Sequence, residues 1–98
     1  MKPLFIPLKT EHYEAFERGE KTIEYRQYGS RWNEETCLIG RGVTLSKGYG
    51  KQNRSYGFIT CFSRIKLKDA PANVATIYPD KEKDIAAINI DLTLQQED

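Results

Sequence analysis

Three stretches of this chain alternate apolar and polar residues, and this two-residue period constrains the fold more than any other feature of the sequence. The alternation covers residues 21–28, 41–47 and 85–94 and predicts strands with one buried and one exposed face. Two further strands are predicted at residues 4–8, where a proline favours a sheet edge, and at residues 56–67, which are rich in β-branched and aromatic side chains. About five strands with few intervening helices favour an antiparallel or mixed sheet, closed into a small barrel.

Two helices complete the predicted fold. Residues 11–18 are expected to form a helix that begins after Thr10, a good N-cap, and ends before Gly19. A helix of one or two turns is expected within residues 70–78, before the last strand. The predicted class is α+β, mainly β, in a single domain over residues 1–98. The predicted core consists of the inward strand residues Ile23, Val43, Leu45, Ile59, Ile88, Ile90, Leu92 and Leu94.

Composition narrows the class of protein. Of the 98 residues, 39% are hydrophobic and 30% are charged, which suits a globular domain better than a disordered chain. No apolar run approaches the ~18 residues of a membrane span, and the first ten residues do not resemble a signal peptide, so we expect a cytoplasmic chain with no membrane partner. Cys37 and Cys61 form no CxxC pair, and His12 is the only histidine. We therefore expect no metal site, no cofactor, and two thiols that pack as small hydrophobes.

Charge is unevenly distributed along the chain. Residues 36–68 contain seven basic side chains and no acidic one, whereas residues 69–98 contain two basic and seven acidic side chains. Because electrostatic fields are local at cellular ionic strength, such a basic middle can attract phosphate groups although the net charge is only +1. The alternative is that these charges are solvated side chains on strand edges, which oppose aggregation.

The segment with the most functional groups runs from residue 18 to residue 26. It follows the predicted helix and places Lys21 at the start of a strand, with Glu24 and Arg26 on the same, outward face of that strand about 7 Å apart. Arg26 can hold a phosphate or a base edge with two donors, Lys21 supplies a point charge, and Glu24 can accept from an exocyclic amine. The alternative is an exposed Glu24–Arg26 ion pair, worth about 0–1 kcal/mol, with no ligand.

The spacing Gly19-x-Lys21-x-x-Glu24-x-Arg26, directly after a short helix, resembles the GxKxxExR signature of the ASCH domain family. The resemblance implies a small β-barrel related to the PUA domain, which binds RNA. It also implies that Lys21, Glu24 and Arg26 gather in a cleft that binds RNA or a nucleotide-like ligand. The general layout agrees along most of the chain, including Ile77-Tyr78-Pro79 before the last strand, but only this eight-residue motif is specific.

A second function follows from the same resemblance. Small bacterial members of the family hydrolyse acetylcytidine with a lysine, a threonine and a glutamate. Lys21 matches the lysine, but Glu24 stands at the threonine position, and residues 69–76 contain no glutamate. An amidohydrolase acting on a modified nucleoside is therefore the alternative, with Lys21 and Glu24 as its acid–base pair. A nucleophilic serine or cysteine would need His12, which has no orienting partner nearby in the sequence.

A glycine-rich basic turn over residues 47–54 is the second candidate site. Tyr49 and Tyr56 could stack on bases, while Lys47, Lys51 and Arg54 could follow phosphate groups. The turn lacks the GxxxxGK[ST] order of a P-loop, which argues against nucleotide hydrolysis. We expect it to form a wall of the cleft, and the alternative is a hairpin whose charges have no ligand.

Overall fold

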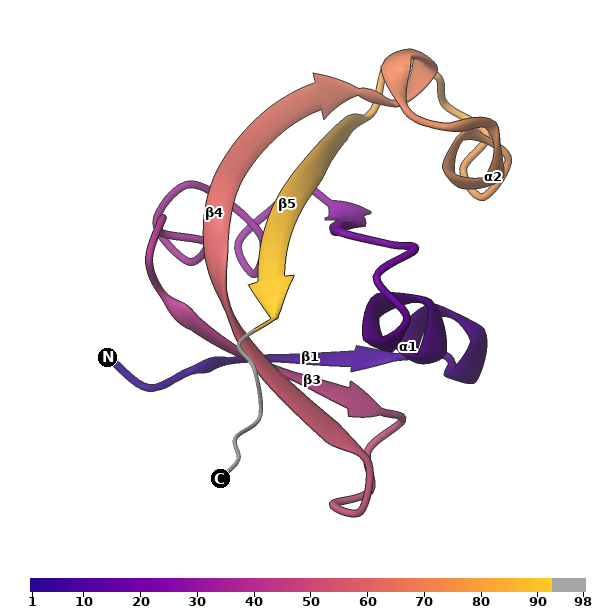
Figure 1. Cartoon of the computed structure of the whole chain (residues 1–98). Helices are drawn as coiled ribbons and strands as arrows, with labels where there is room; N and C mark the ends of the chain where they lie inside the picture. Colours follow the sequence, from indigo (N-terminus) through magenta and orange to yellow (C-terminus); the bar gives the residue numbers. More distant parts are fainter. Residues whose placement is uncertain (93–98) are drawn as a thin grey trace.

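Five strands form one mixed, strongly curled sheet in the computed structural model, which describes residues 1–92 (Figure 1). Along the chain these are β1 (Leu4–Leu8), β2 (Ile23–Gln27), β3 (Gly42–Lys47), β4 (Arg54–Lys66) and β5 (Asp84–Leu92). The order across the sheet is β1-β3-β4-β5-β2, with β1 parallel to β3 and the other pairs antiparallel. The result is a half-barrel whose two edge strands, β1 and β2, face each other across a gap that we call the seam. The predicted mainly β, α+β class is confirmed.

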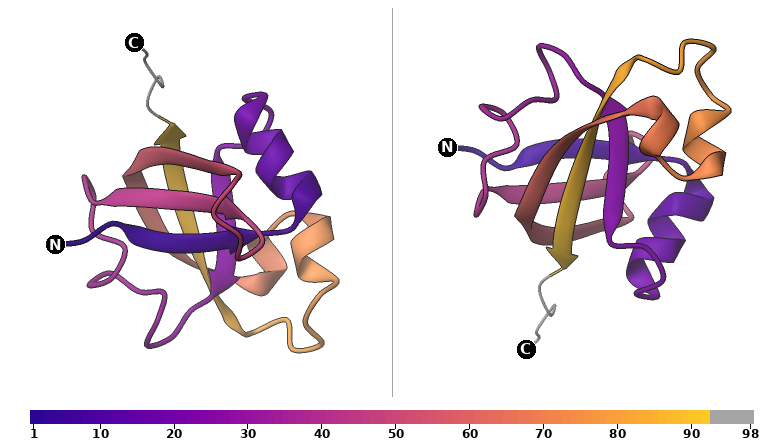
Figure 2. Two further views of the ribbon diagram at one scale, coloured as in Figure 1. Left: turned by 90° about the horizontal axis from the view of Figure 1, so that it is seen from below. Right: turned by 90° about the horizontal axis from the view of Figure 1, so that it is seen from above.

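The two helices are those predicted, with shifted ends. Helix α1 (Thr10–Glu17) has Lys9 rather than Thr10 as its N-cap, so that part of the prediction is wrong. Gly19 follows its C-cap with a φ of 77°, a left-handed conformation that glycine adopts without steric cost. Helix α2 (Ala72–Ala75) is a single turn that begins after Pro71. Both helices lie on the same side of the half-barrel, near the seam (Figure 2).

The main core fills the concave side of the sheet and confirms most of the predicted inward residues. Val43, Leu45, Ile59, Ile88 and Ile90 are buried, and Leu92 packs against them while partly exposed. Leu94 lies outside the described residues. The whole buried cluster is Ile6, Leu8, Tyr13, Phe16, Trp32, Cys37, Val43, Leu45, Ile59, Ala86, Ile88 and Ile90. Trp32 fixes the irregular segment between β2 and β3 to this core.

The faces of β2 are the reverse of the prediction. Residues paired directly across antiparallel strands point to the same face. Glu24 is opposite Ile88 and Arg26 is opposite Ala86, and both partners lie in the main core, so the two charged residues face inward. Ile23 is opposite Asn89 and is only half-buried, so its placement in the core and the polar outer row were wrong.

Strand β4 changes face at an irregularity between Ile59 and Cys61. Such a bulge inserts a residue and shifts the alternation of side chains. Cys61 is exposed, so the expectation that both thiols pack is wrong for this residue. Cys37 is buried, and burial raises the pKa of its thiol.

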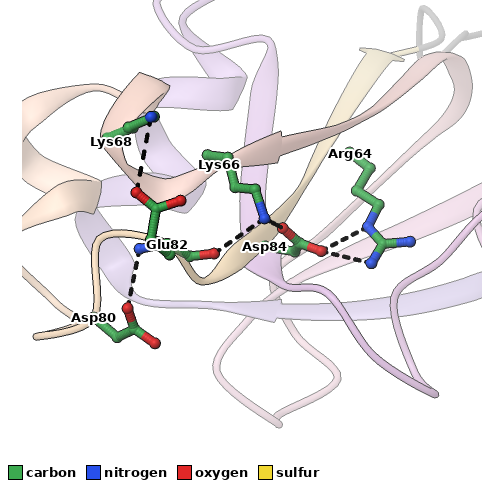
Figure 3. A network of polar contacts seen from close by, with 6 residues as sticks. All are labelled: Arg64, Lys66, Lys68, Asp80, Glu82 and Asp84. Carbon is green, nitrogen blue, oxygen red and sulfur yellow. Dashed lines mark hydrogen bonds and ion pairs between the residues drawn. The ribbon is translucent and has the colours of Figure 1, made fainter.

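A smaller core and an ion-pair network hold the connection from β4 to β5. Leu67, Val74 and Ile85 are buried together, with Tyr25 packed against them, so α2 is held beside β2. Asp84 accepts from Lys66 at 2.9 Å and from Arg64 Nε at 2.8 Å (Figure 3). The connection that carries α2 is therefore fixed at its β5 end. Over residues 1–92, no helix is long and apolar enough to cross a membrane.

Candidate functional site

A pocket of about 610 Å³ opens at the seam between β1 and β2, and we call it the seam pocket. The motif residues Lys21, Glu24 and Arg26 all line it, so the structure brings the three predicted site residues together. The rest of its lining comes from the end of β1, the start of α1, and α2 with its flank: Pro7, Leu8, Lys9, Glu11, His12, Tyr25, Asn73, Val74 and Ile77.

The Glu24 carboxylate binds both motif cations. Glu24 is only 7% exposed, because it faces inward from β2. Its Oε1 lies 3.1 Å from Lys21 Nζ, and its Oε2 accepts a hydrogen bond of 2.8 Å from Arg26 Nε. A buried carboxylate is costly unless it is paired, and here both oxygens are paired. The cluster of three residues therefore keeps one net positive charge at the pocket surface.

Arg26 bridges the two edges of the half-barrel. Its Nη2 donates to the Pro7 carbonyl oxygen on β1, and its guanidinium carbon lies 5.0 Å from the centre of the Trp32 ring. Nε is bound to Glu24, which fixes the plane of the guanidinium. Within residues 1–92, Nη1 has no hydrogen-bond partner. Arg26 is thus pre-oriented and retains donors for a ligand.

His12 is a site residue that sequence reasoning missed. Its Nδ1 lies 3.2 Å from Lys21 Nζ, although nine residues separate them in the sequence. An ammonium group can only donate, so Nδ1 accepts and the ring proton is assigned to Nε2. The sequence shows no orienting partner near His12, because the contact depends on the left-handed Gly19, which turns the chain back and brings Lys21 beside the first turn of α1.

The four residues predicted from the basic turn do not form a single wall of the seam pocket. Lys47 points to α1 and pairs with Glu14 Oε2 at 3.3 Å, away from the other three residues. Tyr49 lines a hollow of about 310 Å³ that shares Pro7, Leu8, Lys9 and Arg26 with the seam pocket. Arg54 lies on the outer face of β4, and Lys51 is exposed at the tip of the turn. Only Tyr49 of these four therefore adjoins the seam pocket.

The side chains that line the seam pocket include cations, the carboxylates of Glu11 and Glu24, and apolar groups. Over residues 1–92, no group of three or more histidine, cysteine, aspartate or glutamate side chains is placed to hold a metal ion. The seam pocket instead combines ammonium, guanidinium and imidazole donors with the apolar walls of Tyr25, Val74 and Ile77. This combination can bind one face of a planar ring and the acceptor atoms on its edge.

No family model and no curated protein matches this chain.

Proposed function

We propose that this chain is an ASCH-like domain that binds RNA or a nucleotide-like ligand in the seam pocket. One observation carries the proposal: a single buried carboxylate, Glu24, holds Lys21 and Arg26 in one pocket beside apolar and aromatic walls. The volume of about 610 Å³ lies within the ordinary range for small-molecule sites. These are the three residues that the GxKxxExR resemblance assigns to the ligand.

The proposed contacts follow from the donors that the protein leaves available. Arg26 Nη1 and the Nε2–H of His12 can donate to phosphate or base oxygens. Glu24 has remaining lone pairs and can accept from an exocyclic amine. Tyr25 and Ile77 provide surface for the flat face of a base. The ligand class is therefore a mononucleotide or one exposed nucleotide of RNA.

Calorimetric titration with the four ribonucleoside monophosphates tests this function. Lys21→Met removes one charge-assisted contact, which is worth about 1.5–3 kcal/mol, so affinity should fall about tenfold or more. Arg18→Met is the matched control, because Arg18 is an exposed cation next to the motif and pairs with Glu20 outside the seam pocket. It should leave affinity unchanged. If no monophosphate binds the wild-type chain, or if both variants bind equally well, the proposal fails.

The second candidate is an amidohydrolase acting on a modified nucleoside such as acetylcytidine. The observation that favours it is the 3.1 Å contact between Lys21 and Glu24 at the pocket surface, since such a pair can exchange protons with a substrate. Thr22, which lies between Lys21 and Glu24 in the sequence, lines a neighbouring pocket of about 460 Å³ and not the seam pocket. No serine, threonine or cysteine belongs to the described lining of the seam pocket.

Deacetylation of acetylcytidine separates the two functions. We expect no turnover by the wild-type chain, because the threonine and the later glutamate that the hydrolases of the family use are both missing from it. Turnover by the wild type that Lys21→Ala eliminates and Arg18→Ala retains would establish the hydrolase instead.

A cytoplasmic location completes the proposal. Both cysteines, Cys37 and Cys61, are free thiols, and Cys61 is exposed to solvent. An exposed thiol stays reduced in the cytoplasm, where RNA and nucleotides are also available.

A further inference from the structure

The outer face of β1, β3 and β4 carries a cluster of aromatic rings that the seam pocket does not use. The strand register places Phe5, Thr44 and Tyr56 in one row across the three strands, and Phe58 in the next row opposite Gly42. Tyr49 lies over Phe5, with 6.2 Å between the ring centres. We call Phe5, Tyr49, Tyr56 and Phe58 the aromatic face.

These rings are unusually open to solvent. Tyr49 is 79% exposed, and Tyr56 and Phe58 are 47% and 48% exposed. The residues between them are small, since Thr44 separates Phe5 from Tyr56 and Gly42 lies beside Phe58. Of the four rings, Tyr49 and Phe58 expose the larger part or about half of their surface. Contiguous apolar surface of this kind marks an interaction site more often than scattered single residues do.

The charge around the aromatic face selects the kind of partner. Arg54 lies on the same outer face, with its guanidinium carbon 5.2 Å from the centre of the Phe5 ring, and Lys51 is exposed in the adjoining turn. Both belong to the stretch of residues 36–68 that contains no acidic side chain. Asp91, opposite Phe58, limits the basic surface on the β5 side. Stacking rings combined with cations fit a single-stranded nucleic acid, whose bases stack and whose phosphates are anionic.

The aromatic face is continuous with the seam pocket. The hollow that Tyr49 lines shares Arg26 and the end of β1 with the seam pocket, and Tyr49 in turn contacts Phe5. A chain of nucleotides could therefore leave the pocket past Arg26, cross Tyr49, and reach Tyr56 and Phe58 without meeting an acidic side chain of the turn.

We propose that the aromatic face binds the nucleotides that flank a nucleotide held in the seam pocket, so that the ligand is a single strand rather than a free mononucleotide. This inference rests on the proposed function of the pocket. It assigns stacking to Tyr49, Tyr56 and Phe58 and phosphate contacts to Arg54 and Lys51. RNA and DNA single strands share this chemistry, and the experiment distinguishes them.

The test compares one nucleotide with several. Binding of labelled hexauridylate and hexathymidylate is measured by fluorescence anisotropy, and binding of uridine monophosphate by competition. The hexamer of the preferred sugar should bind at least tenfold more tightly than the monophosphate. Tyr49→Leu and Phe58→Leu should each reduce hexamer affinity about tenfold, because each removes one stacking ring. Tyr49→Phe keeps the ring and is the matched control, so it should retain the affinity.

The salt dependence of binding tests the proposed phosphate contacts separately. Arg54→Met should lower the slope of log affinity against log salt concentration by about 0.7, the value for one phosphate contact on a single strand. Lys81→Met is the control, because Lys81 is exposed in the turn before β5 and its ammonium group donates to the Ala75 carbonyl, away from the aromatic face.

The outcomes separate this inference from the function on which it rests. If the monophosphate and both hexamers bind equally, or if Tyr49→Leu binds hexamers as the wild type does, the inference fails and the pocket function stands. If Lys21→Met changes neither monophosphate nor hexamer affinity, the pocket function fails. Hexamer binding that depends on Tyr49 but not on Lys21 would overturn the continuous path proposed here.

Discussion

Glu24 yields the sharpest prediction for stability, because its carboxylate pairs with two cations that the fold largely removes from water. In Glu24→Gln, the side chains of Lys21 and Arg26, which are 18% and 23% exposed, lose their counter-charge. Removing one partner of a fully buried ion pair costs about 3–5 kcal/mol. The remaining exposure of both cations, together with the amide oxygen that glutamine retains, reduces the expected cost to about 2 kcal/mol.

A loss of this size is readily measured. In a domain of this length, about 2 kcal/mol lowers the Tm by about 8–16 °C, which circular dichroism detects on heating. Glu20→Gln is the matched control, because Glu20 is 62% exposed and pairs with Arg18 on the surface, so its Tm should stay close to that of the wild type. Equal Tm values for the two variants would refute the argument that Glu24 compensates two otherwise unpaired charges.

Three further predictions concern the core, the acid stability and the thiols. Ile90→Ala should lower the free energy of unfolding in urea by about 2–5 kcal/mol, since Ile90 is 3% exposed, and an unchanged value would contradict its place in the core. Hydrogen bonds from Lys66 and Arg64 hold the pKa of Asp84 below its ordinary value. Asp84 therefore binds fewer protons in the folded than in the unfolded chain. The contribution of ionised Asp84 to the free energy of unfolding is present above the unfolded pKa of about 3.9 and is lost as the pH falls through the lower folded pKa. The urea midpoint of Asp84→Asn should therefore fall less steeply than that of the wild type when the pH is lowered below about 4. Cys61 should react with a thiol reagent at once, whereas Cys37 should react only in denaturant, and rapid modification of both in the native chain would contradict the burial of Cys37.

Alternation predicted where the strands run, but it could not decide which face of β2 points inward. In residues 23–26, apolar and charged side chains alternate, and a charged row is normally placed outside because burying a charge is costly. Here that cost is offset within the motif itself, since Lys21 and Arg26 both bind Glu24. The pairing of β2 with β5 then fixes the inward face, and such long-range register is not visible in a local pattern.

The candidate site was predictable only where it is local in sequence. Lys21, Glu24 and Arg26 lie within six residues of one another, so their proximity follows from chain geometry. His12 reaches Lys21 through the turn at Gly19, and Pro7 reaches Arg26 across the seam, so neither contact has a signal in residue spacing. Lys47 was grouped with Tyr49 and Arg54 because they are close in sequence, but neighbouring residues on a strand and its turn can point to opposite faces.

The contact between Arg26 and the Pro7 carbonyl also bears on self-association. An edge strand with free N–H and C=O groups invites a strand from another copy to add to the sheet. In an extended strand, the N–H and the C=O of one residue point to the same side, and the Pro7 carbonyl points to the seam. Proline has no N–H, and its carbonyl is already taken by a side chain of the same molecule. An incoming strand would need both groups at this point of β1, and neither is available. Arg26 therefore opposes the addition of a strand from another copy to this edge of the sheet.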